Sequence, residues 1–224
     1  MCKLVLKRIN IITGHYGSGK TNLAVNLALS LAAIGQKTCL VDLDIVNPYF
    51  RAADMTQTLE QAGVRVIMPI FARTNLDLPA LPGEVNAVFD DKSYTVILDV
   101  GGDDSGAAAL GRYAKNITSE NNYAHFYVIN AMRILTQKAD DAVSILHQIE
   151  KMGRVPVTQI VNNTNLAGET DAEIIKMSVD FANEVSRQSG LPLAFTSVKK
   201  SLTAELHGQI PNIYPVDIFV NPPW

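Results

Sequence analysis

The 224-residue sequence contains only two cysteines, Cys2 and Cys39. Neither has a second cysteine near it at metal-ligand spacing, so we expect a terminal thiol and a core thiol in a reducing cytosol. The chain also lacks a run of about 20 apolar residues that could cross a bilayer. Its longest apolar stretch, 23–34, is interrupted by Asn26 and Ser30. We therefore expect a cytoplasmic protein without a membrane span or a secretory leader.

The sequence has no run of like charge. Its 19 basic and 22 acidic residues give a formal net charge of −3, which argues against a broad nucleic-acid surface. Glycine and proline, 14 and 10 residues, are near ordinary globular usage and well below the roughly 25–30% typical of disordered chains, which excludes a disordered or fibrous chain. The length suits a domain with its own core, and we expect one domain over residues 1–224.

Short apolar runs rich in β-branched residues alternate with helical patterns. The predicted strands are 9–13, 38–42, 64–70, 95–100, 125–130, 157–162 and 193–197. The predicted helices are 21–34, 83–91, 107–117, 137–152, 171–189 and 201–206, with glycine stops at Gly35, Gly153 and Gly190. Because the strands are apolar on both faces, the pattern predicts an α/β fold with three layers, a mostly parallel sheet of about seven strands flanked by helices.

The segment between the first predicted strand and the first long helix reads GHYGSGKT. It matches the phosphate-binding loop (P-loop) pattern G-x-x-x-x-G-K-[ST] in its expected strand–loop–helix context. Glycines let successive backbone N–H groups surround phosphate oxygens, the lysine reaches the outer phosphates, and the threonine hydroxyl ligates Mg²⁺. The residues predicted to bind nucleotide here are Gly14, Gly17, Ser18, Gly19, Lys20, Thr21 and Asn22.

Acidic residues follow two further strands at the sheet edge where parallel sheets bind ligands. Asp42 and Asp99 each end a β-branched run and are predicted to hold Mg²⁺ together with Thr21. The alternative is that both carboxylates only cap turns or helices. Asp44 stands two residues after Asp42, on the same side of the strand end, and is predicted to hold an attacking water. After Asp99, the pair 101–102 is two glycines, suited to a mobile phosphate-sensing loop or to a plain turn.

With these residues the chain resembles the MinD/ParA group of P-loop ATPases, part of the wider CobQ/CobB/MinD/ParA set. The resemblance rests on the P-loop, on the segments 41–44 and 98–107, and on the late strand that ends at 161–163. It implies that Asp42 and Asp99 hold the Mg²⁺ shell, that Asp44 positions the hydrolytic water and that Asn162 contacts adenine. It also implies an ATP-dependent homodimer that switches a protein partner.

The chain departs from that group in three places. His15 occupies the position of the signature lysine that reaches the partner subunit's phosphates; Arg51 and Arg73 are candidates to replace its charge, or ordinary surface arginines. The paired cysteines of iron–sulfur members are missing, so no iron–sulfur cluster is expected. The proline-broken tail 216–224 has no lysine and does not suit an amphipathic membrane helix.

Other polar residues are assigned structural roles. His125, His147 and His207 have no partner at ligand spacing, and Asp103 and Asp104 are interpreted as helix caps rather than phosphate sensors. The sequence thus predicts a Mg²⁺-ATP-binding protein that hydrolyses ATP slowly, with Lys20 and Asp44 as the catalytic residues, and switches a protein or metalloenzyme partner. The alternatives are a small-molecule kinase or ATP-dependent ligase on the same core, and a scaffold that binds nucleotide without hydrolysing it.

Overall fold

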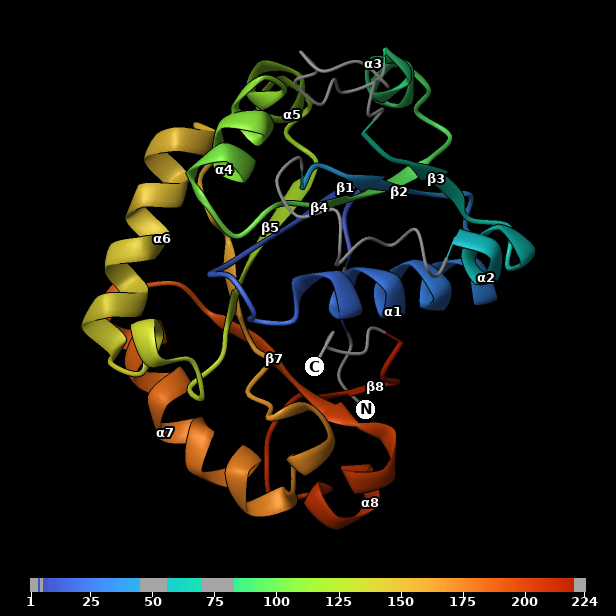
Figure 1. Ribbon diagram of the computed structural model, residues 1–224. Helices are drawn as coiled ribbons and strands as arrows, with labels where there is room; N and C mark the ends of the chain where they lie inside the picture. Colours follow the sequence, from blue (N-terminus) through green and yellow to red (C-terminus); the bar gives the residue numbers. More distant parts are fainter. Residues whose placement is uncertain (1–3, 5, 45–55, 70–82, 220–224) are drawn as a thin grey trace, which may run out of the picture.

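The strands of the computed structural model form one parallel sheet in the order β3-β2-β4-β1-β5-β6-β7-β8 (Figure 1). The structure describes residues 4, 6–44, 56–69 and 83–219. Cys2, Arg51 and Arg73, as well as the whole segment 70–82 and the tail from 220, lie outside these residues. The described strands are β1 (Ile9–Thr13), β2 (Thr38–Asp42), β3 (Arg65–Ile67), β4 (Thr95–Asp99), β5 (Tyr123–Ile129), β6 (Gln159–Asn162), β7 (Leu193–Lys199) and β8 (Ile213–Val216).

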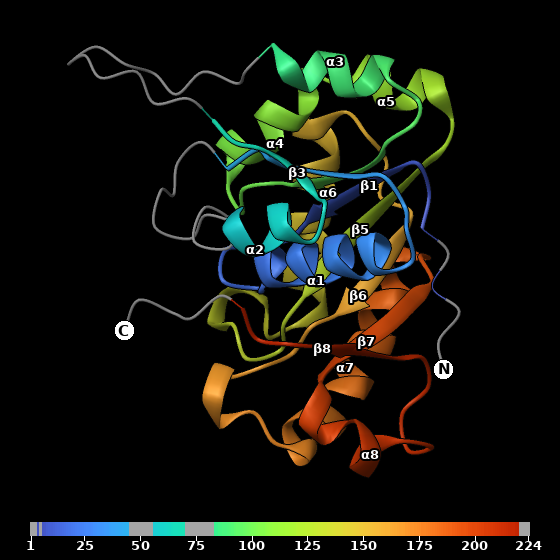
Figure 2. The same ribbon diagram turned by 90° about the vertical axis from the view of Figure 1, so that its right-hand side faces the viewer.

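Helices cover both faces of the sheet. In Figure 1, α1 lies inside the curve of the sheet, whereas α4 to α7 follow its outer side. Figure 2 shows β1 and β3 in the upper part of the view and β7 and β8 in the lower part, with α8 below them. The described helices are α1 (Lys20–Ala33), α2 (Thr56–Gln61), α3 (Glu84–Asp90), α4 (Asp104–Gly111), α5 (Ala114–Glu120), α6 (Ala139–Gly153), α7 (Ala172–Ser189) and α8 (Thr203–Leu206).

The core lies on both sides of the central strands. Every residue of β1 is buried, and its side chains alternate between two clusters. Ile12 packs with the α1 side chains Leu23 and Leu27, and Ile11 packs with Leu110 and Ile117 of α4 and α5. This two-sided burial is what an apolar run without polar alternation predicts, and it confirms the three-layer α/β fold.

Two elements of the sheet region were not predicted, and the sheet has eight described strands rather than seven. Strand β8 contains Pro215 and only one fully buried residue, Val216, so its sequence lacks a strand signal; its edge position tolerates the proline. Helix α2 has a single buried residue, Leu59, so it has almost no amphipathic pattern. Among the described residues, no helix is long and apolar enough to cross a membrane.

Two predicted helix boundaries were wrong for a common reason, the close contact between α4 and α6. The predicted helix 107–117 is two helices, and α4 ends at Gly111, where a Cβ atom would lie 2.9 Å from the carbonyl oxygen of Met152. Gly153 does not stop α6. It lies within the last turn, where a Cβ would be 3.1 Å from Leu110, and Arg154 takes the left-handed conformation instead. The glycine stops at 35 and 190 have positive φ, as predicted.

Candidate functional site

The P-loop connects the carboxyl end of β1 to the first residue of α1, Lys20. Strand β1 lies between β4 and β5, so loops from both neighbours reach the P-loop. Gly19 precedes the helix with φ +86°, and a Cβ there would lie 2.3 Å from the side-chain nitrogen of Asn163. Only glycine fits this position, because both the backbone conformation and the space exclude a side chain.

The Lys20 side chain is buried at the base of the P-loop, with 8% of the residue exposed. Its ammonium group donates a hydrogen bond to the carbonyl oxygen of His15 at 3.2 Å. Burial lowers the pKa of Lys20, whereas the nearby carboxylates of Asp99, Asp44 and Asp103 raise it. The lysine is therefore surrounded by negative charge on one side and by the P-loop backbone on the other.

Asp42 and Asp99 are register partners on the adjacent strands β2 and β4, so the structure brings the two predicted metal ligands together. Burial raises the pKa of Asp99 to about 6, and the hydroxyl of Thr21 and the charge of Lys20 act in the opposite direction. Asp99 Oδ1 and Ser18 Oγ are buried and have no hydrogen-bond partner among the described residues. Buried polar atoms without a partner are costly, which fits a site built for a polar ligand.

Asp44 stands at the opening of the same site. Its backbone N–H donates a hydrogen bond to Asp42 Oδ1 at 2.8 Å, which fixes the turn after β2. The glycine pair after β4 approaches this turn and the P-loop closely. A Cβ on Gly101 would lie 3.2 Å from the Asp44 carboxylate, and one on Gly102 would lie 2.8 Å from Lys20 Nζ. The glycines thus allow close approach of three loops.

The residues after β6 contact the P-loop through Asn163 rather than through Asn162. The side chain of Asn162 is fully buried, donates to Ser178 and accepts from Thr164. The structure does not bring this side chain to the cavity. Asn163 instead donates a hydrogen bond to the Ser18 carbonyl at 2.6 Å. Consecutive side chains at a strand end point to opposite sides, so the amide that lines the cavity is one residue further along.

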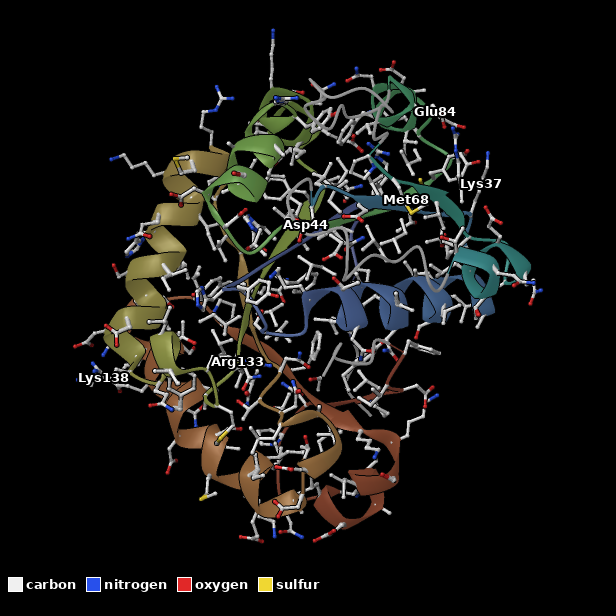
Figure 3. All side chains as sticks on the ribbon, in the orientation of Figure 1. Lys37, Asp44, Met68, Glu84, Arg133 and Lys138 are labelled. Carbon is white, nitrogen blue, oxygen red and sulfur yellow. The ribbon has the colours of Figure 1, made fainter. Side chains whose placement is uncertain are left out.

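Arg133 is a site residue that sequence reasoning missed. It follows β5 and donates a hydrogen bond from Nε to the carbonyl oxygen of Gly17 at 2.7 Å. In Figure 3, Asp44 lies above and Arg133 below the segment that enters α1. No spacing pattern links Arg133 to the P-loop, because 116 residues separate it from Gly17 and only the sheet order brings them together.

A cavity of about 160 Å³ joins these loops. Its lining comprises the P-loop, Asp44, Gly102 and Arg133, together with Asn163, Asn165 and residues at the ends of β7 and β8. Asn22 also lines it and holds the segment after β8 by a hydrogen bond to the carbonyl oxygen of Asp217. The cavity combines a backbone loop suited to phosphate with polar side chains from the loops after β5 and β6.

The four histidines have different environments. Burial lowers the pKa of His15, and the positive charges of Lys20 and Arg133 lower it further, so this side chain is neutral at pH 7. His125 is buried in β5 and hydrogen-bonded to Thr13 and the Val155 carbonyl, a structural role as predicted. His147 is exposed on α6 beside Glu150, and His207 is exposed after α8.

Residues 9–177 match the CobQ/CobB/MinD/ParA nucleotide binding domain. The chain belongs to this family. The match begins at β1 and therefore includes the P-loop, the acidic turns after β2 and β4, and the loop after β6. The chain is thus a nucleotide-binding P-loop protein of the MinD/ParA class. No curated protein sequence matches it.

Solved structures share the fold at low sequence identity. The signal recognition particle 54 kDa protein of Aeropyrum pernix, in complex with GDP, is 22% identical with a TM-score of 0.53, over 84% of this chain and 40% of that one. FtsY of Thermotoga maritima is 24% identical with a TM-score of 0.54, over 85% and 61%. FlhF complexed with GTP and Mg²⁺ is 16% identical with a TM-score of 0.55, over 87% and 67%. The chain spans less than two thirds of the first two proteins.

Proposed function

We propose that this protein binds Mg²⁺-ATP, hydrolyses it slowly and uses the nucleotide state to switch a protein partner. The observation that carries the proposal is the pair of buried, unpartnered oxygens, Ser18 Oγ and Asp99 Oδ1, beside a P-loop with a buried lysine. The family supports nucleotide binding. The site supplies the ammonium group of Lys20 for the phosphates and carboxylates for Mg²⁺ and for the attacking water. We also propose a cytoplasmic location, where nucleoside triphosphates are available.

The donor set fits a magnesium ion. Thr21, Asp42 and Asp99 offer oxygen ligands, and Mg²⁺ takes one or two carboxylates together with water and substrate phosphates. Asp42 and Asp99 lie side by side on two paired strands, and Asp99 keeps one oxygen without a partner among the described residues. Bound there, Mg²⁺ would neutralise charge on the transferring phosphoryl group.

The proposed reaction is attack of water on the γ-phosphorus in line with the bridging oxygen to ADP. The water oxygen forms the new bond, the bond to the bridging oxygen breaks, and ADP and inorganic phosphate leave. Lys20 binds the outer phosphates and stabilises the charge on them, and Asp44 holds the water at the cavity opening. Both residues line the cavity; the Lys20 ammonium group donates to the His15 carbonyl, and the Asp44 backbone N–H donates to Asp42 Oδ1.

The lining of the cavity supports adenine over guanine. Asp44, near the P-loop, is the one carboxylate among the described lining residues, whose other polar side chains include amides and hydroxyls. Guanine offers two neighbouring N–H donors, which a carboxylate accepts best, whereas adenine offers one donor and one acceptor, which an amide matches. We therefore propose ATP as the nucleotide, with competition between ATP and GTP as the test. A preference for GTP would contradict this assignment.

We also propose that the ATP-bound form is a homodimer that closes over the nucleotide. Tyr16 of the P-loop is 45% exposed, and Ile134 and Leu135, which follow Arg133, are 83% and 66% exposed. Exposed apolar residues around a binding site mark an interaction surface. In light scattering of a hydrolysis-blocked variant the mass should double with ATP, and the change of both Ile134 and Leu135 to Ser should prevent this. Ile34→Ser, at the far end of α1, is the control.

Two variants test binding and hydrolysis separately. Lys20→Ala should abolish Mg²⁺-ATP binding in calorimetry while the fold persists, whereas Lys115→Ala on the surface of α5 should bind like the wild type. Unchanged affinity in Lys20→Ala would refute the proposal.

The second variant tests hydrolysis. Asp44→Ala should bind ATP but stop phosphate release, with Asp90→Ala as the control. If the wild type binds ATP and releases no phosphate, the protein is a nucleotide-dependent scaffold instead.

A further inference from the structure

We propose that Arg133 binds the phosphate chain of the nucleotide and supplies, from the same chain, positive charge that His15 does not provide. The inference rests on the proposed function, because it names a further residue for the same ligand. Its evidence is separate, however: it comes from the loop after β5, which no part of the P-loop pattern includes.

The first observation is the position of the guanidinium group. Arg133 Nε donates to the Gly17 carbonyl at 2.7 Å, and a Cβ on Gly17 would lie 3.1 Å from the guanidinium carbon. The arginine thus lies directly against the P-loop backbone, and Gly17 leaves the space for it. Arg133 also lines the same cavity as Lys20 and Thr21, so its charge faces the volume that a nucleotide would occupy.

The second observation is the remaining hydrogen-bonding capacity. A guanidinium group has five N–H donors in a fixed plane, and the contact with Gly17 uses the one on Nε. Neither terminal nitrogen has a hydrogen-bond partner among the described residues, and no described acid forms an ion pair with Arg133. Two N–H groups of this kind, side by side, match two oxygens of a phosphate.

The third observation is that the loop is held in place before any ligand binds. The Arg133 N–H donates to the Asn130 carbonyl, and the Thr136 N–H donates to the Arg133 carbonyl. The Asn130 side chain accepts from Met132 and Asn165, which ties the loop after β5 to the loop after β6. A charged group that is fixed in this way loses little freedom when an anion binds.

The electrostatic environment also supports phosphate binding by Arg133. Burial lowers the pKa of His15, and the charges of Lys20 and Arg133 lower it further, so two positive charges lie near one segment of the P-loop. Like charges held close together repel each other, and an anion between them removes the repulsion. A triphosphate carries the charge that this arrangement needs.

A structural alternative is that Arg133 only supports the Gly17 carbonyl, and Arg133→Gln separates the two roles. The glutamine amide nitrogen occupies the chain position of Nε and keeps a donor for Gly17, but it has no charge and no terminal nitrogens. Charge-assisted hydrogen bonds contribute about 1.5–3 kcal/mol, so we expect the Kd for Mg²⁺-ATP to rise about 10- to 150-fold in Arg133→Gln. The effect should decrease from ATP to ADP to AMP.

Calorimetry on the full chain tests this, with circular dichroism and Tm to confirm folding. Arg112→Gln, an exposed arginine between α4 and α5, is the matched control and should bind ATP like the wild type. If Arg133→Gln binds ATP like the wild type while Lys20→Ala does not, the inference is overturned and the proposed function stands. An equal loss in both arginine variants would also overturn it. If the wild type binds no ATP, the proposed function itself fails.

Discussion

The side-chain amide of Asn163 donates a hydrogen bond to the backbone carbonyl of Ser18 at 2.6 Å, across 145 residues of sequence. A hydroxyl from β7, that of Ser197, donates to the carbonyl oxygen of the same amide. Asn163 therefore connects the loop after β6, the end of β7 and the P-loop. Asn163 and Arg133, which lies after β5, both donate hydrogen bonds to P-loop carbonyls. Neither residue belongs to the P-loop sequence motif.

Asn163→Ala should weaken nucleotide binding even though residues 14–21 stay unchanged. The substitution removes the hydrogen bond to the Ser18 carbonyl, whereas the Ser197 hydroxyl keeps the Asn162 carbonyl as a partner. A buried group left unsatisfied costs about 1–3 kcal/mol. We expect the free energy of unfolding to fall by an amount in this range, and the Kd for ATP to rise about tenfold because the loop is less well fixed. Chemical denaturation and calorimetry measure the two effects.

Asn116→Ala is the control for this prediction, because Asn116 is an exposed asparagine on α5. It should leave both quantities within experimental error of the wild type. Should Asn163→Ala bind ATP as tightly as the wild type, the contact with Ser18 is unimportant for the P-loop.

Gly102→Ala should impair the site sterically. A Cβ at this position would lie 2.6 Å from the backbone nitrogen of Tyr16 and 2.8 Å from Lys20 Nζ, so the loop after β4 must move away from the P-loop or displace the lysine. We expect at least a tenfold loss of ATP affinity in calorimetry, about 1.4 kcal/mol or more.

Gly83→Ala provides a matched comparison, since no atom lies within 4 Å of a Cβ there and its φ of −57° suits alanine. This variant should bind ATP normally. Equal affinity in the two alanine variants would mean that the loop after β4 moves freely and that its contact with Lys20 has no role in binding.

The sequence and the structure agree best where one physical signal dominates. Strands β1 and β2 have the predicted bounds because an apolar run buried on both faces has little competition from other patterns. Asp42 and Asp99 could be placed at one edge because parallel strands end at the same side of a sheet. In contrast, Asn162 was expected in the cavity, and only the alternation at the end of β6 shows that Asn163 takes this place.

Arg133 could not be predicted for a different reason. Its role depends on β5 being the neighbour of β1, and a single sequence does not give the strand order. The same holds for β8, which is recognised as a strand because it pairs with β7 and not by its composition. Local patterns therefore gave the P-loop and its acids, whereas the contacts that support the loop from other strands required the fold.

His125 should make stability depend on pH below neutrality. Burial in β5 lowers the pKa of His125 from 6.5 to about 4, so between these values the unfolded chain binds a proton here and the folded chain does not. The free energy of unfolding therefore falls as the pH falls through this window. Between pH 7 and pH 5 this one group accounts for a loss of about 2 kcal/mol, measurable by urea denaturation.

His125→Gln isolates this contribution, because glutamine keeps a donor and an acceptor but does not titrate. The variant should lose about 2 kcal/mol less than the wild type between pH 7 and pH 5, whatever its stability at pH 7. Parallel pH profiles for the two proteins would show that His125 is protonated in the folded state at pH 5, against the buried, neutral side chain described here.

Asp103 and Asp104 are neighbouring acids with different predicted effects on stability. Asp103 is the N-cap of α4, and its carboxylate accepts the Gly106 N–H at 2.8 Å, whereas Asp104 is exposed in the first turn. Asp103→Ala should lower the free energy of unfolding by about 1 kcal/mol, the usual cost of a lost cap. Asp104→Ala should cost only a few tenths of a kcal/mol through the helix dipole.

The two acids also differ in their electrostatic effect on the site, because the charge of Asp103 raises the pKa of Lys20. Removing Asp103 takes away a negative charge near the position proposed for the phosphates. Asp103→Ala should therefore not reduce ATP affinity. Equal stability losses in the two variants, measured by urea denaturation, would contradict the cap, and a large loss of ATP affinity in Asp103→Ala alone would make this acid a phosphate sensor instead.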